Sequence, residues 1–249
     1  MHKLANLVAS CAALAAVSGV ADANLILVGG DPLAPVATVA DSFTDLGAAA
    51  FGNAPRMLTL QTNGVETGNV TPVDVVHGDA VPGANKSTTP TLATLGWTSG
   101  AEVGIGFDFE QTGGTGITMQ SLVLTIFNGT TPVGSFSVAP SLTPLTFTAA
   151  DFALLLGNGN AVFNFGLNAA EQAQFNTILA QPGSSGFFAG LSAELGCPAG
   201  APAGCLVSND GPDTFLGFHQ SATSAVPEPA TLALLGLGLA GLGFSRRKR

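Results

Sequence analysis

The last 24 residues constrain the chain most, because a proline-containing turn, an uncharged apolar segment and a basic cluster follow one another there. Residues Val226–Pro229 read Val-Pro-Glu-Pro, and the two prolines restrict φ and favour a turn just before a helix. Residues Ala230–Phe244 carry no charge and as a helix span roughly 22 Å, less than the roughly 30 Å core of a bilayer. Arg246–Arg249 are basic and resist translocation. The tail therefore predicts a short membrane helix with its C-terminus inside.

This order of blocks resembles the PEP-CTERM sorting signal of Gram-negative bacteria. The residues that carry the resemblance are Val226, Pro227, Glu228, Pro229, Arg246, Arg247, Lys248 and Arg249. In that family a membrane enzyme, the exosortase, recognises and processes the tail, and the proteins are linked to exopolysaccharide or biofilm matrix. The resemblance implies a transient exosortase partner, a membrane contact through residues 230–244, and a final location at the cell surface or in the matrix.

The opposite end carries a complementary signal. Lys3 precedes an apolar stretch, Leu4–Val20, and Ala21-Asp22-Ala23 resembles a cleavage site, so residues 1–23 predict a secretory signal peptide. An alternative is a lipobox at Val8–Cys11, although few residues precede it. The expected organisation is a signal peptide (1–23), one domain (24–219), a linker (220–225) and the sorting signal (226–249).

The expected domain is strongly acidic. Between the two terminal signals only Arg56 and Lys86 are basic, against 14 acidic residues (16 in the chain less Asp22 and Glu228), a net charge of 2 − 14 = −12. Such a surface has no basic patch for phosphates, so nucleic acid is not an expected partner.

Two cysteines remain after removal of the signal peptide. Cys197 and Cys205 enclose Pro-Ala-Gly-Ala-Pro-Ala-Gly, which offers no His, Asp or Glu to complete a metal site. A pair in an exported chain favours a disulfide, which in the chain-entropy model stabilises by roughly 2–3 kcal/mol.

Short alternating segments predict β-strands through most of the body. The clearest are Val103–Phe109, Ile117–Phe127 and Val133–Val138, which we expect to form an antiparallel meander with a tight turn at Asn128-Gly129. In Ile117–Phe127 the alternation assigns Met119 to the face opposite Leu122, Leu124 and Ile126. Further strands are expected at 25–28, 57–62, 161–165, 187–191 and 215–218, whereas 66–90 predicts a long excursion with one short strand near 73–76.

Two segments have helical start and stop signals. Thr148 precedes Ala149–Leu156 with Asp151 in the first turn and Gly157 as the stop, and Asn168 precedes a second helix with Glu171 at the capping-box position. We therefore predict an all-β fold: a single antiparallel, jelly-roll-like β-sandwich with one or two short accessory helices.

Catalytic motifs are scarce. The expected domain contains His77 and His219, no tyrosine and no cysteine outside the proposed disulfide. His77-Gly78-Asp79 is the only close His–carboxylate pair, and a solvated loop is the more common setting for such a histidine. We expect no enzymatic activity and no cofactor.

Three further features have both a functional and a structural interpretation. Asp108 and Glu110 lie on one face of a strand, where paired carboxylates can bind Ca²⁺ or flank a glycosidic bond, but a solvated strand face looks the same. Asn209–Asp213 offers three oxygen-bearing side chains, with an Asx turn as the default. Trp97, the only tryptophan, is expected in the core, although an exposed one could stack on a sugar.

The sequence thus predicts an exported, non-enzymatic envelope or matrix protein sorted by an exosortase. A carbohydrate-binding or adhesive module, with or without calcium, is the alternative, and an exported hydrolase is a third.

Overall fold

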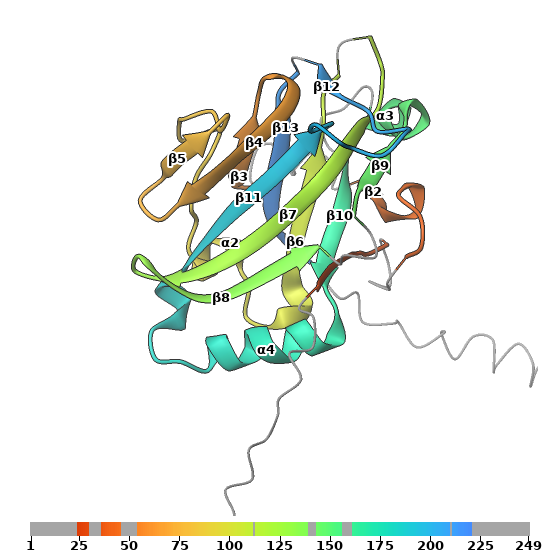
Figure 1. Ribbon diagram of the computed structural model, residues 1–249. Helices are drawn as coiled ribbons and strands as arrows, with labels where there is room; N and C mark the ends of the chain where they lie inside the picture. Colours follow the sequence, from red (N-terminus) through yellow and green to blue (C-terminus); the bar gives the residue numbers. More distant parts are fainter. Residues whose placement is uncertain are drawn as a thin grey trace, which may run out of the picture.

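The protein is mostly β-structure, arranged in one strongly curled sheet (Figure 1). The computed structural model describes residues 24–29, 36–45, 54–111, 113–138, 143–155, 161–209 and 211–220. Thirteen strands lie in this part of the chain. They are β1 (Asn24–Leu27), β2 (Phe43–Asp45), β3 (Arg56–Leu60), β4 (Asn63–Thr71), β5 (Val75–Gly78), β6 (Val103–Asp108), β7 (Ile117–Asn128), β8 (Thr131–Val138), β9 (Leu145–Phe147), β10 (Ala161–Leu167), β11 (Phe188–Gly196), β12 (Ser208–Asn209) and β13 (Asp213–His219).

The strands follow one hydrogen-bonded path, β12-β4-β11-β7-β8-β1-β10-β6-β13-β3, with β5, β2 and β9 attached to its sides. Pairing is antiparallel except between β1 and β8. The sheet curls so that β4, β11 and β7 lie in front of β3, β13 and β6 (Figure 1). Residues that follow β5 meet β3 through a bridge between Leu60 and Ala80 and a bond from the Val81 N–H to the Thr59 carbonyl (2.8 Å). The two ends of the path therefore touch.

The interior of the curl is one hydrophobic core, rich in phenylalanine. Phe107 of β6 lies at its centre: its ring stacks on Phe215 (4.6 Å between centroids) and on Phe109 (5.5 Å), and meets Phe147 edge-on (5.0 Å). Because Phe147 belongs to β9, which pairs with β7, these contacts join strands from the two facing halves. Burial of aromatic rings contributes the largest apolar areas available to a core.

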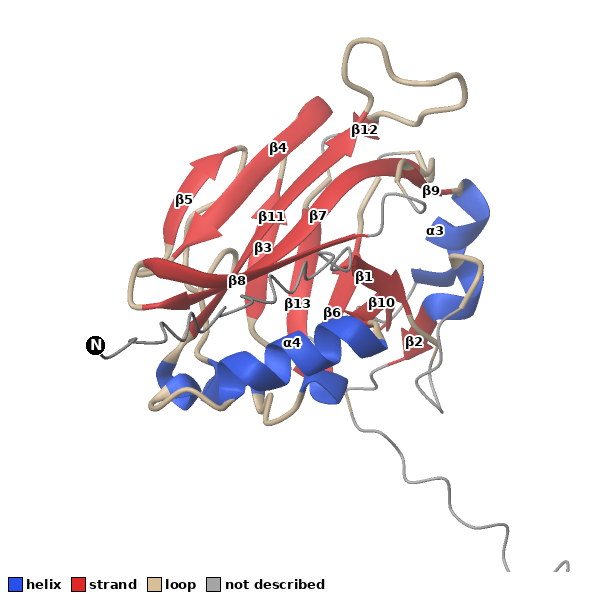
Figure 2. Ribbon diagram, turned by 60° about the horizontal axis from the view of Figure 1, so that its bottom comes forward, coloured by secondary structure: helices blue, strands red, loops and turns tan. Residues whose placement is uncertain are grey.

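In the described ranges three short α-helices accompany the sheet: α2 (Leu92–Leu95), α3 (Ala149–Leu155) and α4 (Ala169–Leu179). Helix α4 runs across one end of the sheet (Figures 1 and 2). It begins with the predicted capping box, in which Asn168 Oδ1 accepts from the Glu171 N–H (3.0 Å) and Glu171 Oε2 accepts from the Asn168 N–H (2.9 Å). Thr148 and Asp151 cap α3 in the same reciprocal way. The same part of the chain also contains three single turns of 3-10 helix, η1 (Ala40–Ser42), η3 (Gly100–Glu102) and η4 (Ser184–Gly186).

The strands at residues 103–108, 117–128 and 131–138 are confirmed, and so is the tight turn, where Gly129 has φ 59°. The predicted meander is wrong: β7 pairs with β8, but β6 lies between β10 and β13. Strand β6 is apolar on one face and has glycines on the other. The side chain of Val162 on β10 packs within 2.9 Å of the place where a Cβ on Gly106 would lie, so both faces of the strand are covered.

Two further expectations are corrected. Met119 is fully buried together with Leu122, because a β-bulge opposite Glu194 and Leu195 shifts the alternation by one residue. The excursion predicted for 66–90 contains most of β4, a nine-residue strand. Its glycines and asparagines have low strand propensity, and its pairing with β11 overrides this local preference.

The all-β class with short helices is confirmed, with one helix more than expected. The sandwich and jelly-roll description stays a prediction, since the strands form a single curled sheet. The predicted signal peptide and the C-terminal segment lie outside the described residues. Within the described ranges no helix has the length and apolar character needed to cross a membrane.

Candidate functional site

The sorting motif at residues 226–249 lies outside the described residues, but the structure shows where the chain leaves the domain. Gln220, the first residue of the predicted linker, is buried directly after β13. Its N–H donates to the Glu102 carbonyl (2.9 Å), and its Nε2 donates to Asn164 Oδ1 (2.9 Å) and to the Phe165 carbonyl (3.2 Å). Gln220 thus belongs to the folded domain and fixes the point from which the tail departs.

Trp97 stabilises the same region from inside. Its side chain is 2% exposed, its ring meets Phe175 of α4 edge-on (6.1 Å), and its Nε1 donates to the Phe218 carbonyl (2.9 Å). The expectation of a buried tryptophan is confirmed. A residue so enclosed presents no ring face to a sugar.

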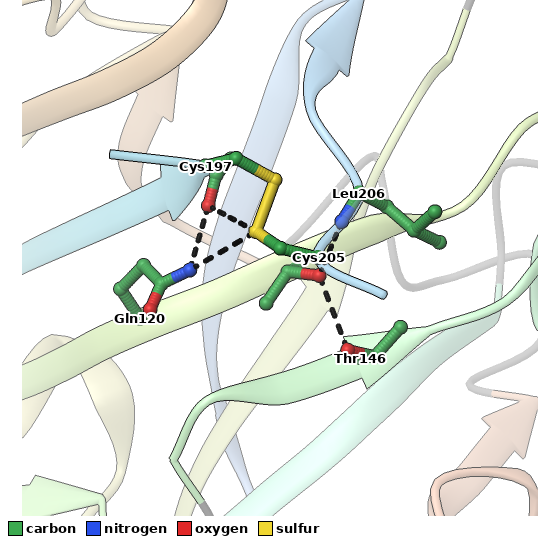
Figure 3. The surroundings of a disulfide bond; sticks show 7 residues. Gln120, Thr146, Cys197, Cys205 and Leu206 are labelled. Atoms are coloured by element: carbon green, nitrogen blue, oxygen red, sulfur yellow. Dashed lines mark hydrogen bonds between the residues drawn. A yellow bond between two sulfur atoms is a disulfide. The ribbon is translucent and has the colours of Figure 1, made fainter. Parts of the chain in front are cut away.

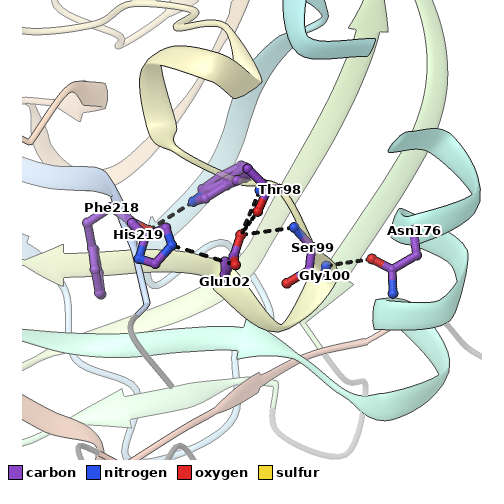
Figure 4. A network of polar contacts seen from close by, with 8 residues as sticks. Thr98, Ser99, Gly100, Glu102, Asn176, Phe218 and His219 are labelled. Carbon is purple, nitrogen blue, oxygen red and sulfur yellow. Dashed lines mark hydrogen bonds and ion pairs between the residues drawn. The ribbon is translucent and has the colours of Figure 1, made fainter. Parts of the chain in front are cut away.

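Glu102 organises the polar contacts around this exit point (Figure 4). Its Oε2 accepts from the Thr98 N–H and Oγ1 (both 2.7 Å) and from the Ser99 N–H (3.0 Å). Partial burial acts to raise the pKa of Glu102, but these hydrogen bonds and the nearby His219 outweigh it and lower the pKa below its usual value. His219 Nε2 lies 3.7 Å from Oε1, and its side chain is 45% exposed, so the pair adds little stability.

The predicted disulfide between Cys197 and Cys205 is present, with the two Cα atoms 5.8 Å apart (Figure 3). It closes the loop between β11 and β12. Gln120, at the bulge of β7, donates from Nε2 to the Gly196 carbonyl (2.7 Å), and the Leu206 N–H donates to Thr118 Oγ1 (2.8 Å). The loop is therefore attached to β7 on both sides of the bridge.

An acidic cluster lies at the other end of β13. We define it as Glu66, Asp79, Asp108, Glu110 and Asp213. The Glu110 N–H donates to Asp213 Oδ1 (3.1 Å), and the Thr67 N–H donates to Asp79 Oδ2 (2.8 Å). Glu66 and Asp213 are fully buried, whereas Glu110 is exposed. Sequence reasoning anticipated the pair Asp108 and Glu110 but missed Glu66, because the excursion predicted for 66–90 obscured β4.

Burial dominates the electrostatics of Asp108. Burial and, to a smaller extent, the charge of Glu110 raise the pKa of Asp108 to about 7, while Arg56 acts in the opposite direction. The charge of Glu110 thus acts on Asp108, as their strand spacing predicted. A half-buried acid that titrates near neutrality is the kind of group that can transfer protons, but burial alone produces the same shift.

The other predicted site residues do not assemble into a site. His77 is exposed on β5, and the Asp79 carboxylate beside it is bonded to the backbone of Thr67. Asn209 donates from Nδ2 to Thr115 Oγ1 (2.9 Å) on the surface, whereas Asp213 points into the buried cluster. Across the described ranges no group of three or more His, Cys, Asp or Glu side chains is placed to hold a metal ion.

Comparison with known protein families confirms the interpretation of the tail. Residues 225–248 match the family model of the PEP-CTERM protein-sorting motif. The motif implies recognition by an exosortase, export, and sorting to the surface of a Gram-negative cell. No curated protein and no solved structure matches the chain.

Replacing both Cys197 and Cys205 by serine should lower the free energy of unfolding by about 2–3 kcal/mol, because the open chain regains loop entropy when unfolded. Urea unfolding of the exported domain, with and without reductant, measures this. The double variant should be indifferent to reductant, and reduced wild type should approach it. Wild-type stability that does not change on reduction would contradict the prediction.

Asp108→Asn should stabilise the domain at alkaline pH. The raised pKa means that the stability contributed by the neutral acid is complete below about pH 4 and is lost as the pH rises through about 7. Asparagine stays neutral, so at pH 8.5 the variant should exceed wild type by about 1–2 kcal/mol after allowance for solvent screening, and at pH 4 the two should agree.

Urea unfolding at the two pH values measures the difference. Glu194→Gln, on the outward side of β11, is the matched control and should show no such crossover. A gain at pH 8.5 that is equally large at pH 4 would mean that the substitution acts through packing and not through charge.

Proposed function

We propose that this chain is a non-enzymatic cargo of the exosortase pathway: an acidic β-domain delivered to the cell envelope or the extracellular matrix, where it associates with exopolysaccharide. The PEP-CTERM motif at residues 225–248 is the observation that carries the proposal. The finer fold description, a jelly-roll-like sandwich derived from a single curled sheet, belongs to the same proposal.

The composition of the body supports the proposal. An acidic, disulfide-bonded domain suits an oxidising exterior, where thiols form bridges and net charge maintains solubility. Asp213, whose pKa is raised well above its usual value, is fully buried together with Glu66, so neither carboxyl is within reach of a substrate. These features are those of a structural cargo that is delivered by its tail.

The alternatives of a glycan-binding module and a hydrolase have less support. Burial of Trp97 removes the one tryptophan that could have served as a stacking platform, and the Asp79 carboxylate, the predicted partner of His77, accepts a hydrogen bond from the Thr67 backbone N–H. Glycan-array binding with and without EDTA tests the glycan-binding module, and turnover of glycosides or esters that is lost in His77→Ala tests the hydrolase.

Replacing Pro227, Glu228 and Pro229 by alanine should leave the protein uncleaved in the inner membrane of an exosortase-containing host, because the enzyme loses its recognition residues while the membrane segment and basic end remain. Fractionation and intact mass report the outcome. Thr223→Ala with Ser224→Ala is the matched control and should be processed normally. Normal surface delivery of the triple variant would refute the proposed function.

The distance between the domain and the motif gives a second prediction. Gln220 is held in the domain, and seven residue steps separate it from Pro227, so their Cα atoms are at most about 25 Å apart. A membrane enzyme that acts at Pro227–Pro229 must therefore work close to the face that carries Glu102 and Gln220.

Deleting residues 221–225 reduces the span to about 7 Å, which brings the folded domain against the enzyme and the bilayer. The rate at which the exosortase processes the tail should fall at least about tenfold, because the motif can no longer reach its proper position in the enzyme. Replacing the same five residues by a Gly/Ser sequence of equal length should restore it. If the deletion is processed at the wild-type rate, the enzyme does not approach the domain from this side.

A further inference from the structure

Two buried acids from strands near opposite ends of the sheet path meet in the interior. Glu66 lies on β4, second from one end of the path, and Asp213 begins β13, second from the other end. Both side chains are 0% exposed, and their carboxyl groups are in hydrogen-bonding contact. Two charged carboxylates at this separation repel each other strongly in a medium of low polarity.

The neighbouring donors show how the pair is satisfied. Glu66 Oε1 accepts from the Thr62 N–H (2.6 Å), and Asp213 Oδ1 accepts from the Glu110 N–H (3.1 Å). Gln111 Nε2 adds long contacts of 3.4 Å to both oxygens of Asp213. The Ser208 hydroxyl lies close enough to Glu66 to act on its pKa, but it donates to the Thr62 carbonyl (3.1 Å). Among the described residues Glu66 Oε2 has no donor, although it is completely buried. The hydrogen that Oε2 lacks is supplied if one of the two carboxyls is protonated.

We propose that Glu66 and Asp213 share one proton, and that this carboxyl–carboxylate bond is a latch that holds β4 against β13 and closes the curl of the sheet. Loss of the shared proton leaves two adjacent buried negative charges and opens the latch. The domain then loses the contact between the two ends of its strand path.

The charged groups around the latch reinforce its dependence on the proton. Asp79, which follows β5, and Glu110, which follows β6, are both acidic, and Asp79 adds to the repulsion felt by Glu66. On β3 the only cation is Arg56, whose Nη1 donates to the Asn85 carbonyl (2.9 Å) and which acts on Asp108. His77 on β5 is exposed, and Glu194 on β11 lies on the outward side of its strand.

The direction of the pH dependence follows from burial. Desolvation raises the pKa of Glu66 above its usual value, and the pKa of Asp213 is raised well above its usual value by desolvation and by the charge of Glu66. A folded pKa that exceeds the unfolded one gives stability that is complete below about pH 4 and is lost as the pH rises through the raised values. The latch is therefore strongest in acid and opens on the alkaline side.

Glu66→Gln tests the latch with an isosteric group. The amide oxygen can accept from the Thr62 N–H, and the amide nitrogen can donate to Asp213 without a titrating proton. Wild type should lose on the order of 10 °C in Tm between pH 5 and pH 9, by the general cost of a buried uncompensated charge. The variant should lose clearly less. Equal losses in both proteins would overturn the proposal.

Two controls keep the test decisive. The first control is Glu171→Gln in the capping box of α4. Glu171 is another buried acid, and burial raises its pKa to about 7. Its removal should leave the contribution of the latch to the pH dependence of Tm intact. If Glu66→Gln does not fold, the same test is made with Asp213→Asn. The asparagine Oδ1 can accept from the Glu110 N–H while the asparagine Nδ2 donates to Glu66. The infrared difference spectrum between wild type and either latch variant at neutral pH should contain the band of one protonated carboxyl, over the contribution that Asp108 and Glu171 make in both proteins.

Calcium provides the competing explanation for two adjacent buried carboxyls. A cation would bind both groups and also the amide oxygen of Gln111, which has no hydrogen-bond partner among the described residues. Extracellular calcium sites have dissociation constants up to roughly 10⁻³ M, so about 5 mM CaCl₂ is enough to occupy one. If the latch is a shared proton, neither this CaCl₂ concentration nor the same concentration of EDTA changes the Tm at pH 8. A rise in Tm with calcium that Glu66→Gln abolishes would overturn the shared proton in favour of a metal site.

Discussion

The closure of one curled sheet is the constraint on which the rest of this structure depends. A sheet of this size exposes two edges unless its ends meet, and here β3 reaches the chain after β5 through the Leu60–Ala80 bridge. Apolar contacts hold the two halves of the sheet together, since Phe107 contacts rings from strands of both halves in one core. Polar contacts then fix the two ends of the domain, at the acidic cluster and at Gln220.

Strand β13 connects these two ends. Asp213 at its start enters the acidic cluster, and His219 at its end precedes Gln220, where the tail leaves. Between them the strand is paired on both sides, with β6 and with β3, and Phe215 contributes to the central aromatic stack. The point of departure of the sorting signal is therefore held by the same strand that closes the sheet, so its position depends on correct folding of the whole domain.

The sequence predicted local features that depend on neighbours in the chain. The capping box of Asn168 and Glu171, the disulfide and the alternation in β6 all follow from spacing within about ten residues, and all are present. It failed where a distant partner decides the outcome. Strand β4 exists because β11 pairs with it, and Met119 faces the core because of a bulge. The buried contact of Glu66 with Asp213 spans most of the chain, and no local pattern indicates it.

The distribution of charge relates the domain to its tail. Cations are almost absent from the body, so an acid that becomes buried there finds a proton more readily than a counter-ion, and the pKa values of Glu66, Asp108, Glu171 and Asp213 are all raised by desolvation. The basic residues are concentrated at Arg246–Arg249, beyond the uncharged segment. Anionic lipids of a cytoplasmic leaflet attract such a cluster and repel an acidic body. The sequence therefore predicts that the two ends of the molecule lie on opposite sides of a membrane, and under the proposed function the short connection between Gln220 and Pro227 limits how far the domain can lie from that membrane.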